Sequence, residues 1–317
     1  KANPSIYNKH SLGTRLARDF KMNKYKYLLI LPVLVYLALF AYKPMYGLII
    51  AFKNYRTTRG IFGSDWVGVL WFETFFTDPY FWRLLRNTFL LSALSIVFGF
   101  PAPILLALML NEVRSTRYRK LVQTVTYAPH FISVVVLCGI IHLFLSPEYG
   151  IVNAAIQGLG FEPIFFLQKG GMFKWIYVIS GLWQGTGWGS IIYLASIAGI
   201  DPVFYEAATI DGATLLKRVW HVDLPGILPT VVILLIMRCG SVMSVGVEKG
   251  YLMQTDLNLR ASELISTYVY KVGLTSVGTG TQFSYATAIG LFNSVINLII
   301  LALVNAISRR LSATSLW

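Results

Sequence analysis

Long uncharged apolar stretches alternate with short polar segments along the whole chain. The apolar stretches cover residues 27–42 with a continuation over 44–52, 87–111, 121–147, 175–200, 224–237 with a continuation to 247, and 272–308. An apolar helix needs about 20 residues to cross the hydrocarbon core of a bilayer. Each stretch therefore predicts one membrane-spanning helix, and the chain predicts six.

Composition agrees with a polytopic membrane protein. The 317 residues are 56% hydrophobic and 13% charged, with a mean hydropathy of +0.61, whereas soluble domains carry about 25% charged residues. The period-two alternation of a barrel is absent, and only helices or closed barrels satisfy backbone polar groups in lipid. We predict an all-α fold in which residues 1–26 form a basic tail, 27–311 the membrane domain and 312–317 a second tail.

Lysine and arginine placement predicts the orientation. Fifteen of these residues fall on the side that holds both termini and ten on the other side, and the richer side is expected to face the cytoplasm. The net charge of +13 suits contact with anionic lipid at the ends of the spans rather than binding of nucleic acid.

One polar insert, "YEAATIDGATLLKRVWHVDLP" (205–225), separates the fourth and fifth spans on the predicted cytoplasmic side. Asp201 and Pro202 are typical of a helix start, and Asp211-Gly212 should end this helix after Ile210. A second short helix is expected over 213–221, ended by Leu224-Pro225. Such a compact protrusion would transmit movement to the spans that it joins; the alternative is a passive connector on the lipid surface.

The insert resembles the cytoplasmic signature of permease subunits of binding-protein-dependent ABC importers. It has a Glu-Ala-Ala start, a Gly six residues after the Glu and a Leu-Pro close, although Val222 stands where Ile is usual. The resemblance implies a coupling helix that sits in a groove of the ATP-hydrolysing subunit. The residues expected to couple are Glu206, Ala207, Ala208, Asp211, Gly212, Ala213, Leu224 and Pro225.

Other segments are similar to the carbohydrate-uptake group of this family, and to its importers of oligo- and polysaccharides such as alginate. These are "YKPMYGLIIAFKNY" (42–55), "WVGVLWFETFFTDPYFWRLLRNTF" (66–89), "SVGVEKGYLM" (244–253) and "YATAIGLFNSVINLIILALVN" (285–305). The resemblance implies a six-helix type I importer permease in a bacterial inner membrane. It also implies three partners: a second homologous permease in a heterodimer, an ATPase dimer that binds ATP and Mg²⁺, and an extracytoplasmic solute-binding protein.

The sequence lacks the motifs that would indicate catalysis by this chain. The dipeptide Gly-Lys of a nucleotide-binding loop never occurs, and no His or Cys pair has metal-site spacing. We therefore expect no catalytic residue, metal or cofactor in this chain. An ion-coupled sugar transporter remains the alternative, although the fourteen acidic residues lie in the tail, in loops or near span ends rather than deep in the bilayer.

Family distances counted from Glu206 suggest which residues line the substrate pathway between the two permeases. They reach Gly181, Gln184, Gly185, Trp188, Arg238, Ser241 and Val245. The first four share one helix face, where an aromatic ring and an amide suit sugar CH surfaces and hydroxyls. Packing is the alternative for Trp188, and bridging between helices is the alternative for Gln184.

Arg238 is the most informative of these residues, because an arginine at a helix centre in the bilayer costs at least about 2.5 kcal/mol. It is expected to neutralise a carboxylate of an acidic saccharide, or else to pair with Glu248 or with a partner subunit. Together with Lys43, Lys53, Arg56 and Arg59 it favours an acidic substrate, unless the outer cations only reach toward the membrane interface.

Overall fold

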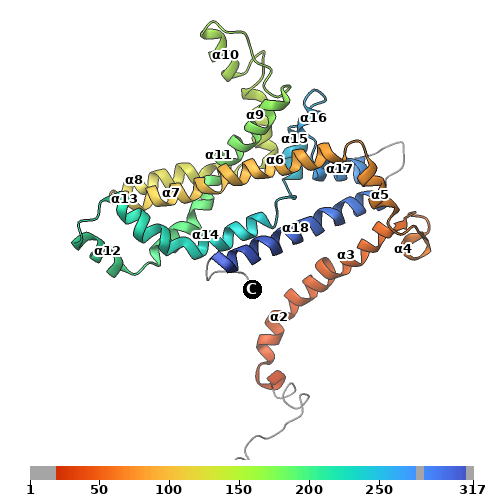
Figure 1. The fold of residues 1–317 in the computed structure, drawn as a ribbon, viewed down its shortest axis with the longest axis horizontal. Coiled ribbons are helices and arrows are strands. Elements are labelled where there is room, and N and C mark those ends of the chain that lie inside the picture. The colour runs from red at the N-terminus through yellow and green to blue at the C-terminus, as the bar shows by residue number, and fades with distance from the viewer. Residues whose placement is uncertain (1–18, 276–281, 312–317) are drawn as a thin grey trace, which may run out of the picture.

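The computed structural model describes residues 19–275 and 282–311, and nearly all regular structure in them is helical (Figure 1). The long elements are α2 (Lys24–Tyr36), α6 (Phe81–Gly99), α7 (Pro101–Glu112), α8 (Thr116–Tyr127), α9 (Val134–Phe144), α11 (Gly170–Ala198), α14 (Leu224–Cys239) and α18 (Phe283–Leu311). The predicted all-α class is confirmed. The strands in the described residues, β1 (Lys53–Asn54) and β2 (Asp65–Trp66), form one short antiparallel pair.

Six spans can be traced through the described residues. Four helical stretches are long and apolar enough to cross a membrane: Lys24–Phe52, Phe81–Glu112, Leu215–Cys239 and Phe283–Arg310. Two bent pairs supply the others: Thr116–Phe131 with Val134–Phe144, and Gly170–Ala198 with Pro202–Ile210. Counting each bent pair as one span gives the predicted six.

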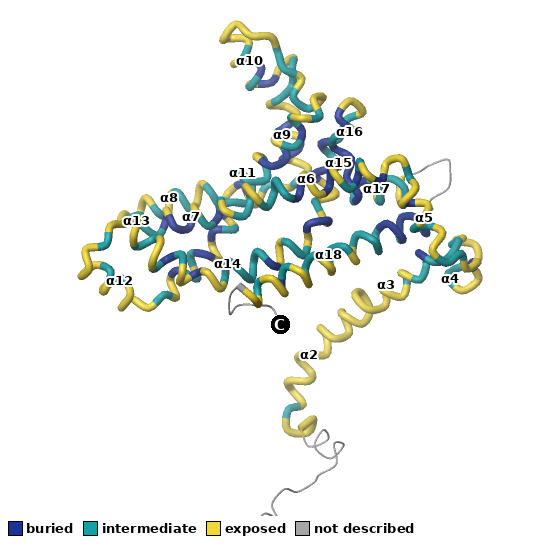
Figure 2. Tube along the Cα trace, in the orientation of Figure 1, coloured by how far each residue is buried: buried dark blue, intermediate teal, exposed yellow. Residues whose placement is uncertain are grey.

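The first span, Lys24–Phe52, is helical throughout; its last segment packs against α18, whereas its first helix, α2, stands apart from the bundle. Beyond α2 it continues as a π-helical segment, Leu37–Tyr42, then α3 (Lys43–Met45) and a 3₁₀ segment, Tyr46–Phe52. None of the residues of α2 is buried (Figure 2). Its apolar surface is therefore free for lipid or for another subunit.

The third span is broken rather than gently kinked. Pro129 lies in a 3₁₀ turn, Ala128–Phe131, and the helices on its two sides meet at 98°. Proline removes a helical hydrogen bond, and Ser133 then starts α9 by accepting a hydrogen bond from the backbone N–H of Val136 at 3.3 Å. Pro101 lies at the start of α7, after a short interruption at Phe100 between α6 and α7.

The prediction that Leu224-Pro225 ends the second helix of the insert was wrong. After α13 (Leu215–Arg218) the chain forms a π-helical turn, Val219–Asp223, and continues directly into α14. A proline lacks the N–H that an α-helix requires, and the wider π turn accommodates it without ending the helix. The coupling segment and the fifth span therefore form one helical run, Leu215–Cys239.

The fifth span is shorter than predicted, because it ends at Cys239 instead of reaching Val247. A Cβ at Gly240 would lie 2.7 Å from Cδ1 of Leu301, so the chain passes α18 closely where it leaves the helix. Asn297 accepts from the backbone N–H of Met243 at 2.9 Å, and Ser92 donates to the Val242 carbonyl. These side chains satisfy non-helical backbone inside the bundle, which lipid could not do.

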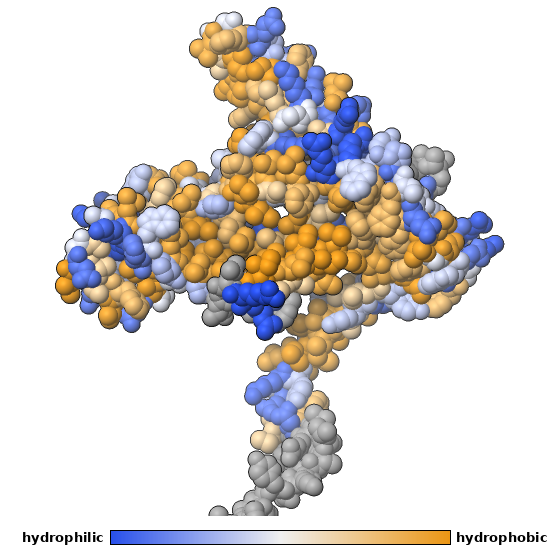
Figure 3. All heavy atoms as spheres, viewed as in Figure 1, coloured by the Kyte–Doolittle hydropathy of each residue, from blue (hydrophilic) through white to orange (hydrophobic). Residues whose placement is uncertain are grey.

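The helix α11 lies at the centre and packs against α6, α7, α8 and α14. Figure 1 shows α12 (Pro202–Ile210) and α13 together at one end of the bundle, with α4 (Gly60–Gly63) and α5 (Leu70–Thr77) at the opposite end. The remaining short helical segments are α10 (Ile151–Gly158), α15 (Val247–Leu252), α16 (Leu259–Ser262), α17 (Ile265–Tyr270) and the π-helical Lys271–Thr275; the last four pack against the long helices. Hydrophobic atoms dominate the middle of the bundle surface in Figure 3.

Candidate functional site

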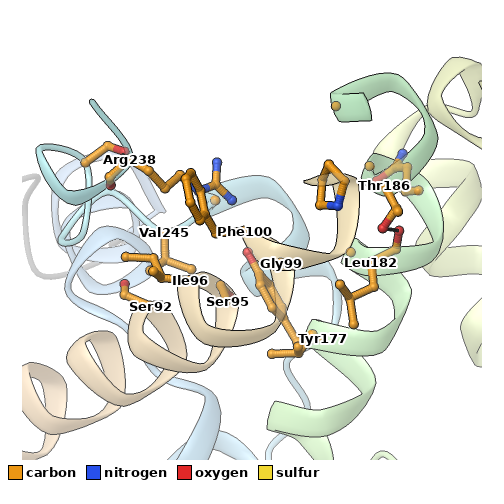
Figure 4. Close-up of a pocket in the computed structure, with 18 of the residues that line it drawn as sticks. Ser92, Ser95, Ile96, Gly99, Phe100, Tyr177, Leu182, Thr186, Arg238 and Val245 are labelled. Atoms are coloured by element: carbon orange, nitrogen blue, oxygen red, sulfur yellow. Dashed lines mark hydrogen bonds between the residues drawn. The ribbon is translucent and has the colours of Figure 1, made fainter. Parts of the chain in front are cut away.

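A central cavity of about 550 Å³ opens between α6, α7, α11 and α14. Its wall mixes apolar side chains with hydroxyl groups, among them Ser92, Ser95 and Thr186. In Figure 4 Arg238 reaches toward Phe100, while Leu182 and Thr186 come from α11 on the opposite side. A cavity of this size and mixed polarity suits a small organic ligand or part of a longer one.

The structure brings together six of the seven residues that the sequence placed along a pathway. The residues that line the central cavity are Gly181, Gln184, Gly185, Arg238, Ser241 and Val245. Trp188 does not line it. Its ring stacks on His130 with centroids 4.6 Å apart and an interplanar angle of 2°, so its place in the structure is the packing alternative.

Gln184 has a defined backbone partner. Its Nε2 donates to the carbonyl of Ile132 at 2.8 Å, at the break between α8 and α9. The amide therefore satisfies one of the carbonyls freed by that break, as the bridging alternative expected, and its side chain still forms part of the cavity wall.

Arg238 lies in the last turn of α14 rather than at the centre of a span. This position is favourable because the C-terminal end of a helix carries partial negative charge. Among the described residues Arg238 has no ion pair, and the pair with Glu248 that the sequence left open is not formed. Its charge is available to the cavity.

Sequence reasoning missed Lys249, which it counted as a cation of an outer loop. Lys249 lies on α15, is 8% exposed and lines the central cavity. Its Nζ donates to the Tyr177 carbonyl at 2.8 Å and lies 4.5 Å from the centroid of the Tyr177 ring. Burial lowers the pKa of Lys249 to about 8. The only signal in the sequence is a lysine inside the otherwise sparsely charged stretch 244–253.

The coupling segment, residues 201–226, has the first helix and the turn that the sequence predicted. Asp201 accepts a hydrogen bond from the backbone N–H of Val203 at 3.0 Å and begins α12. Gly212 has a φ of +66°. The N–H groups of Gly212 and Ala213 donate to the carbonyls of Thr209 and Ala208 at 3.1 and 2.9 Å. This is the Schellman arrangement, in which a left-handed glycine reverses the chain after a helix.

Two side-chain pairs, both missed by the sequence analysis, brace the coupling segment: one joins its two halves and the other ties it to α7. Tyr205 donates to the buried carboxylate of Asp223, and Arg218 forms an ion pair with Glu112 at the end of α7. The first pair connects α12 to the helical run that continues into α14, and the second connects that run to α7, so the segment is not a slack loop.

The coupling segment also presents apolar side chains to its surroundings. Those exposed by more than half are Val203, Phe204, Ile210, Leu215, Leu216 and Trp220. Glu206 is exposed, and it makes no hydrogen bond or ion pair within the described part of the chain. A protruding apolar surface with a free carboxylate is typical of a site for another protein.

Comparison with known proteins gives consistent matches. The model of the family "Binding-protein-dependent transport system inner membrane component" matches residues 99–313. Protein LplB of Bacillus subtilis (strain 168) is 42% identical over 297 residues, 94% of this chain and 92% of that protein. The polygalacturonan/rhamnogalacturonan transport system permease protein YteP of the same organism is 42% identical over 303 residues, 96% of this chain and 93% of that protein.

A chain of a solved bacterial alginate ABC transporter, in complex with an alginate pentasaccharide-bound periplasmic protein, has the same fold. The TM-score is 0.87 at 41% identity, and the match covers 95% of this chain and 100% of that chain. These findings confirm the resemblance and favour an ABC importer over an ion-coupled transporter. In such importers ATP hydrolysis is carried out by partner subunits and not by the permease. The chain therefore belongs to the family of binding-protein-dependent transport system inner membrane components, the multi-pass permease subunits of ABC transporters.

Proposed function

We propose that this chain is one of two related permeases that form the pathway of an ATP-driven importer for oligo- or polysaccharides, with acidic saccharides as the preferred substrates. An extracytoplasmic solute-binding protein delivers the saccharide, and an ATPase dimer that binds ATP and Mg²⁺ drives the cycle. The complex lies in a bacterial inner membrane, with both termini of this chain and the coupling segment in the cytoplasm. Relatives and neighbours that handle polygalacturonan and alginate support a saccharide substrate.

The observation that carries this proposal is the single helical run Leu215–Cys239. Its first turn belongs to the exposed coupling segment, and its last turn carries Arg238 at the central cavity. Force applied to the segment therefore reaches the cavity through one rigid element. A passive connector would not require such continuity.

The need for a second permease is supported by α2 and by the cavity. The apolar helix α2 has no buried residue, and Arg238 is exposed on one side of the cavity in this single chain. A second permease packed there would cover apolar surface and complete the cavity wall, which lipid cannot do for an arginine.

Purification in mild detergent tests the assembly. A second permease and an ATP-binding-cassette ATPase should copurify with this chain, and the binding protein should join them when saccharide is present. Proteoliposomes that contain this complex should accumulate a galacturonate trisaccharide only when supplied with ATP. Uptake that continues without ATP and stops when a proton or sodium gradient collapses would contradict the proposal.

A further inference from the structure

Lys249 places a buried positive charge in the wall of the central cavity without an acidic partner. The side chain is 8% exposed, and no carboxylate of the described residues lies within ion-pair distance of it. Its sequence neighbour Glu248 is exposed and does not line the cavity. Burying a charge without a counter-ion is costly, so a structural role alone gives no reason for a lysine here.

Tyr177 fixes the position of this charge. The Tyr177 carbonyl accepts one hydrogen bond from Nζ, and the ring of the same residue lies beside the ammonium group. The contact with the ring face partly stabilises a cation. An ammonium group has three N–H donors, and the hydrogen bond to the Tyr177 carbonyl uses one of them.

Gly181 lies next to the ammonium group and places no side chain over it. A Cβ at this position would lie 3.5 Å from Nζ of Lys249, and both residues line the cavity. Glycine permits close approach of a ligand to a helix backbone. A ligand in the cavity can therefore approach the nitrogen beside Gly181.

We propose that Lys249 binds a carboxylate of the passing saccharide and, with Arg238, makes the cavity select uronate-containing chains over neutral ones. This inference rests on the function proposed above and names Lys249 as the residue that recognises the negative charge of the saccharide. The two cations come from different elements, α15 and α14, and both line the central cavity. Two positive charges in the wall suit a saccharide with a carboxylate on successive rings, because each ring presents one anion.

The test uses the complete transporter in proteoliposomes with two matched probes: a galacturonate trisaccharide and its methyl ester, which lacks the charge. Lys249→Gln should lower ATP-dependent uptake of the acid at limiting concentration by roughly tenfold or more, since hydrogen bonds to charged groups are strong. Uptake of the ester by this variant should stay within about twofold of its uptake by the unchanged protein. Lys249→Arg should retain the preference for the acid.

Lys169→Gln serves as the matched control, because Lys169 is exposed and does not line the cavity; it should change neither probe. An equal loss of uptake of the acid and the ester in Lys249→Gln, or no loss of uptake of either, would overturn the inference. The assembly of each variant is followed by size-exclusion chromatography, so that a folding defect is seen directly. Failure of the unchanged complex to import any saccharide would contradict the proposed function instead.

Discussion

Arg218 of the coupling segment forms an ion pair with Glu112, the last residue of α7. The two side chains are 28% and 17% exposed, so the pair is more strongly shielded than a typical surface salt bridge. It connects the segment to the second span as well as to the fourth and fifth spans that flank it. A signal from the ATPase therefore has a direct route to three spans.

Removal of this ion pair should weaken both the fold and the coupling. Glu112→Gln leaves the Arg218 charge without its partner and should lower the free energy of unfolding by roughly 1–3 kcal/mol. The saccharide imported per ATP hydrolysed should also fall. Thermal unfolding in detergent and parallel uptake and ATPase assays measure these effects.

The half-exposed pair of Arg59 and Asp65 provides the control, at 3.3 Å with side chains 50% and 63% exposed. Arg59→Gln should change the free energy of unfolding by less than about 1 kcal/mol and leave coupling intact. If the double variant Glu112→Gln with Arg218→Gln is no better than the sum of the single variants, the two side chains do not act as a pair.

Gly212 should tolerate only residues that accept a left-handed backbone. A Cβ there meets nothing within 4 Å, so the cost of substitution comes from the φ of +66° and not from a clash. Gly212→Val should strain the turn by about 1–2 kcal/mol and reduce uptake per ATP. Gly212→Asn should behave nearly normally, because asparagine adopts this conformation more easily. Equal behaviour of the two variants would refute this account of the turn.

Glu206→Lys should uncouple ATP hydrolysis from transport without destabilising the permease. The Glu206 side chain is exposed and makes no ion pair within the described residues, so reversal of its charge affects only a docking partner. We expect an unchanged unfolding temperature, weaker retention of the ATPase on purification and loss of uptake. Normal uptake by this variant would show that the coupling segment is a passive connector.

Arg238→Ala should weaken uptake of an acidic saccharide more than that of its neutral ester. The arginine has no ion pair among the described residues and lines the central cavity, so its truncation leaves no orphaned acid behind. The expected loss for the acid is roughly tenfold. Equal loss of acid and ester uptake would indicate that Arg238 has a structural role.

The pH dependence of uptake should reveal the charge of Lys249. Its pKa is lowered to about 8, so the charge is present below pH 8 and is lost as the pH rises through this value. The preference for acid over ester should fall over that range, and Lys249→Arg should abolish the fall because arginine stays charged. The titratable groups near Lys249 include Tyr177, Cys138 and its sequence neighbour Glu248, and Arg238 lines the same cavity; all four remain in the arginine variant.

The free energy of unfolding should rise with pH over the range in which the preference for acid over ester falls. Between the lowered pKa of about 8 and the ordinary value of 10.5, the unfolded chain binds a proton at Lys249 that the folded chain does not. The free energy of unfolding contributed by this residue therefore rises with pH in that window. Uptake and stability that fall together above pH 8 would argue against Lys249 as the origin of the effect.

Apolar stretches and turn residues were sufficient to predict the number of spans and the first half of the coupling segment. Hydropathy depends on composition alone, and Asp201, Pro202 and Gly212 act through their nearest neighbours along the chain. The end of the fifth span was wrong by eight residues, since it depends on Gly240 meeting Leu301 and on Asn297 reaching Met243. Those contacts join distant parts of the chain and leave no local pattern.

The residues of the cavity were likewise predicted only in part. Family distances found Arg238 and the glycines of α11, but Trp188 stacks on His130 because the third span breaks at Pro129. Lys249 was missed because its burial depends on how its loop folds. Its loop folds back into the bundle, and sequence distance from the nearest span gave no measure of its burial.

The length of the continuous helix from Leu215 to Cys239 also determines how far a tilt at the coupling segment displaces its other end. A helix of 25 residues is about 37 Å long, so a rotation of about 10° around one end sweeps the other through about 6 Å. That arc exceeds the breadth of a sugar ring. A small tilt at the docking surface is therefore enough to carry Arg238 from one side of a bound residue to the other.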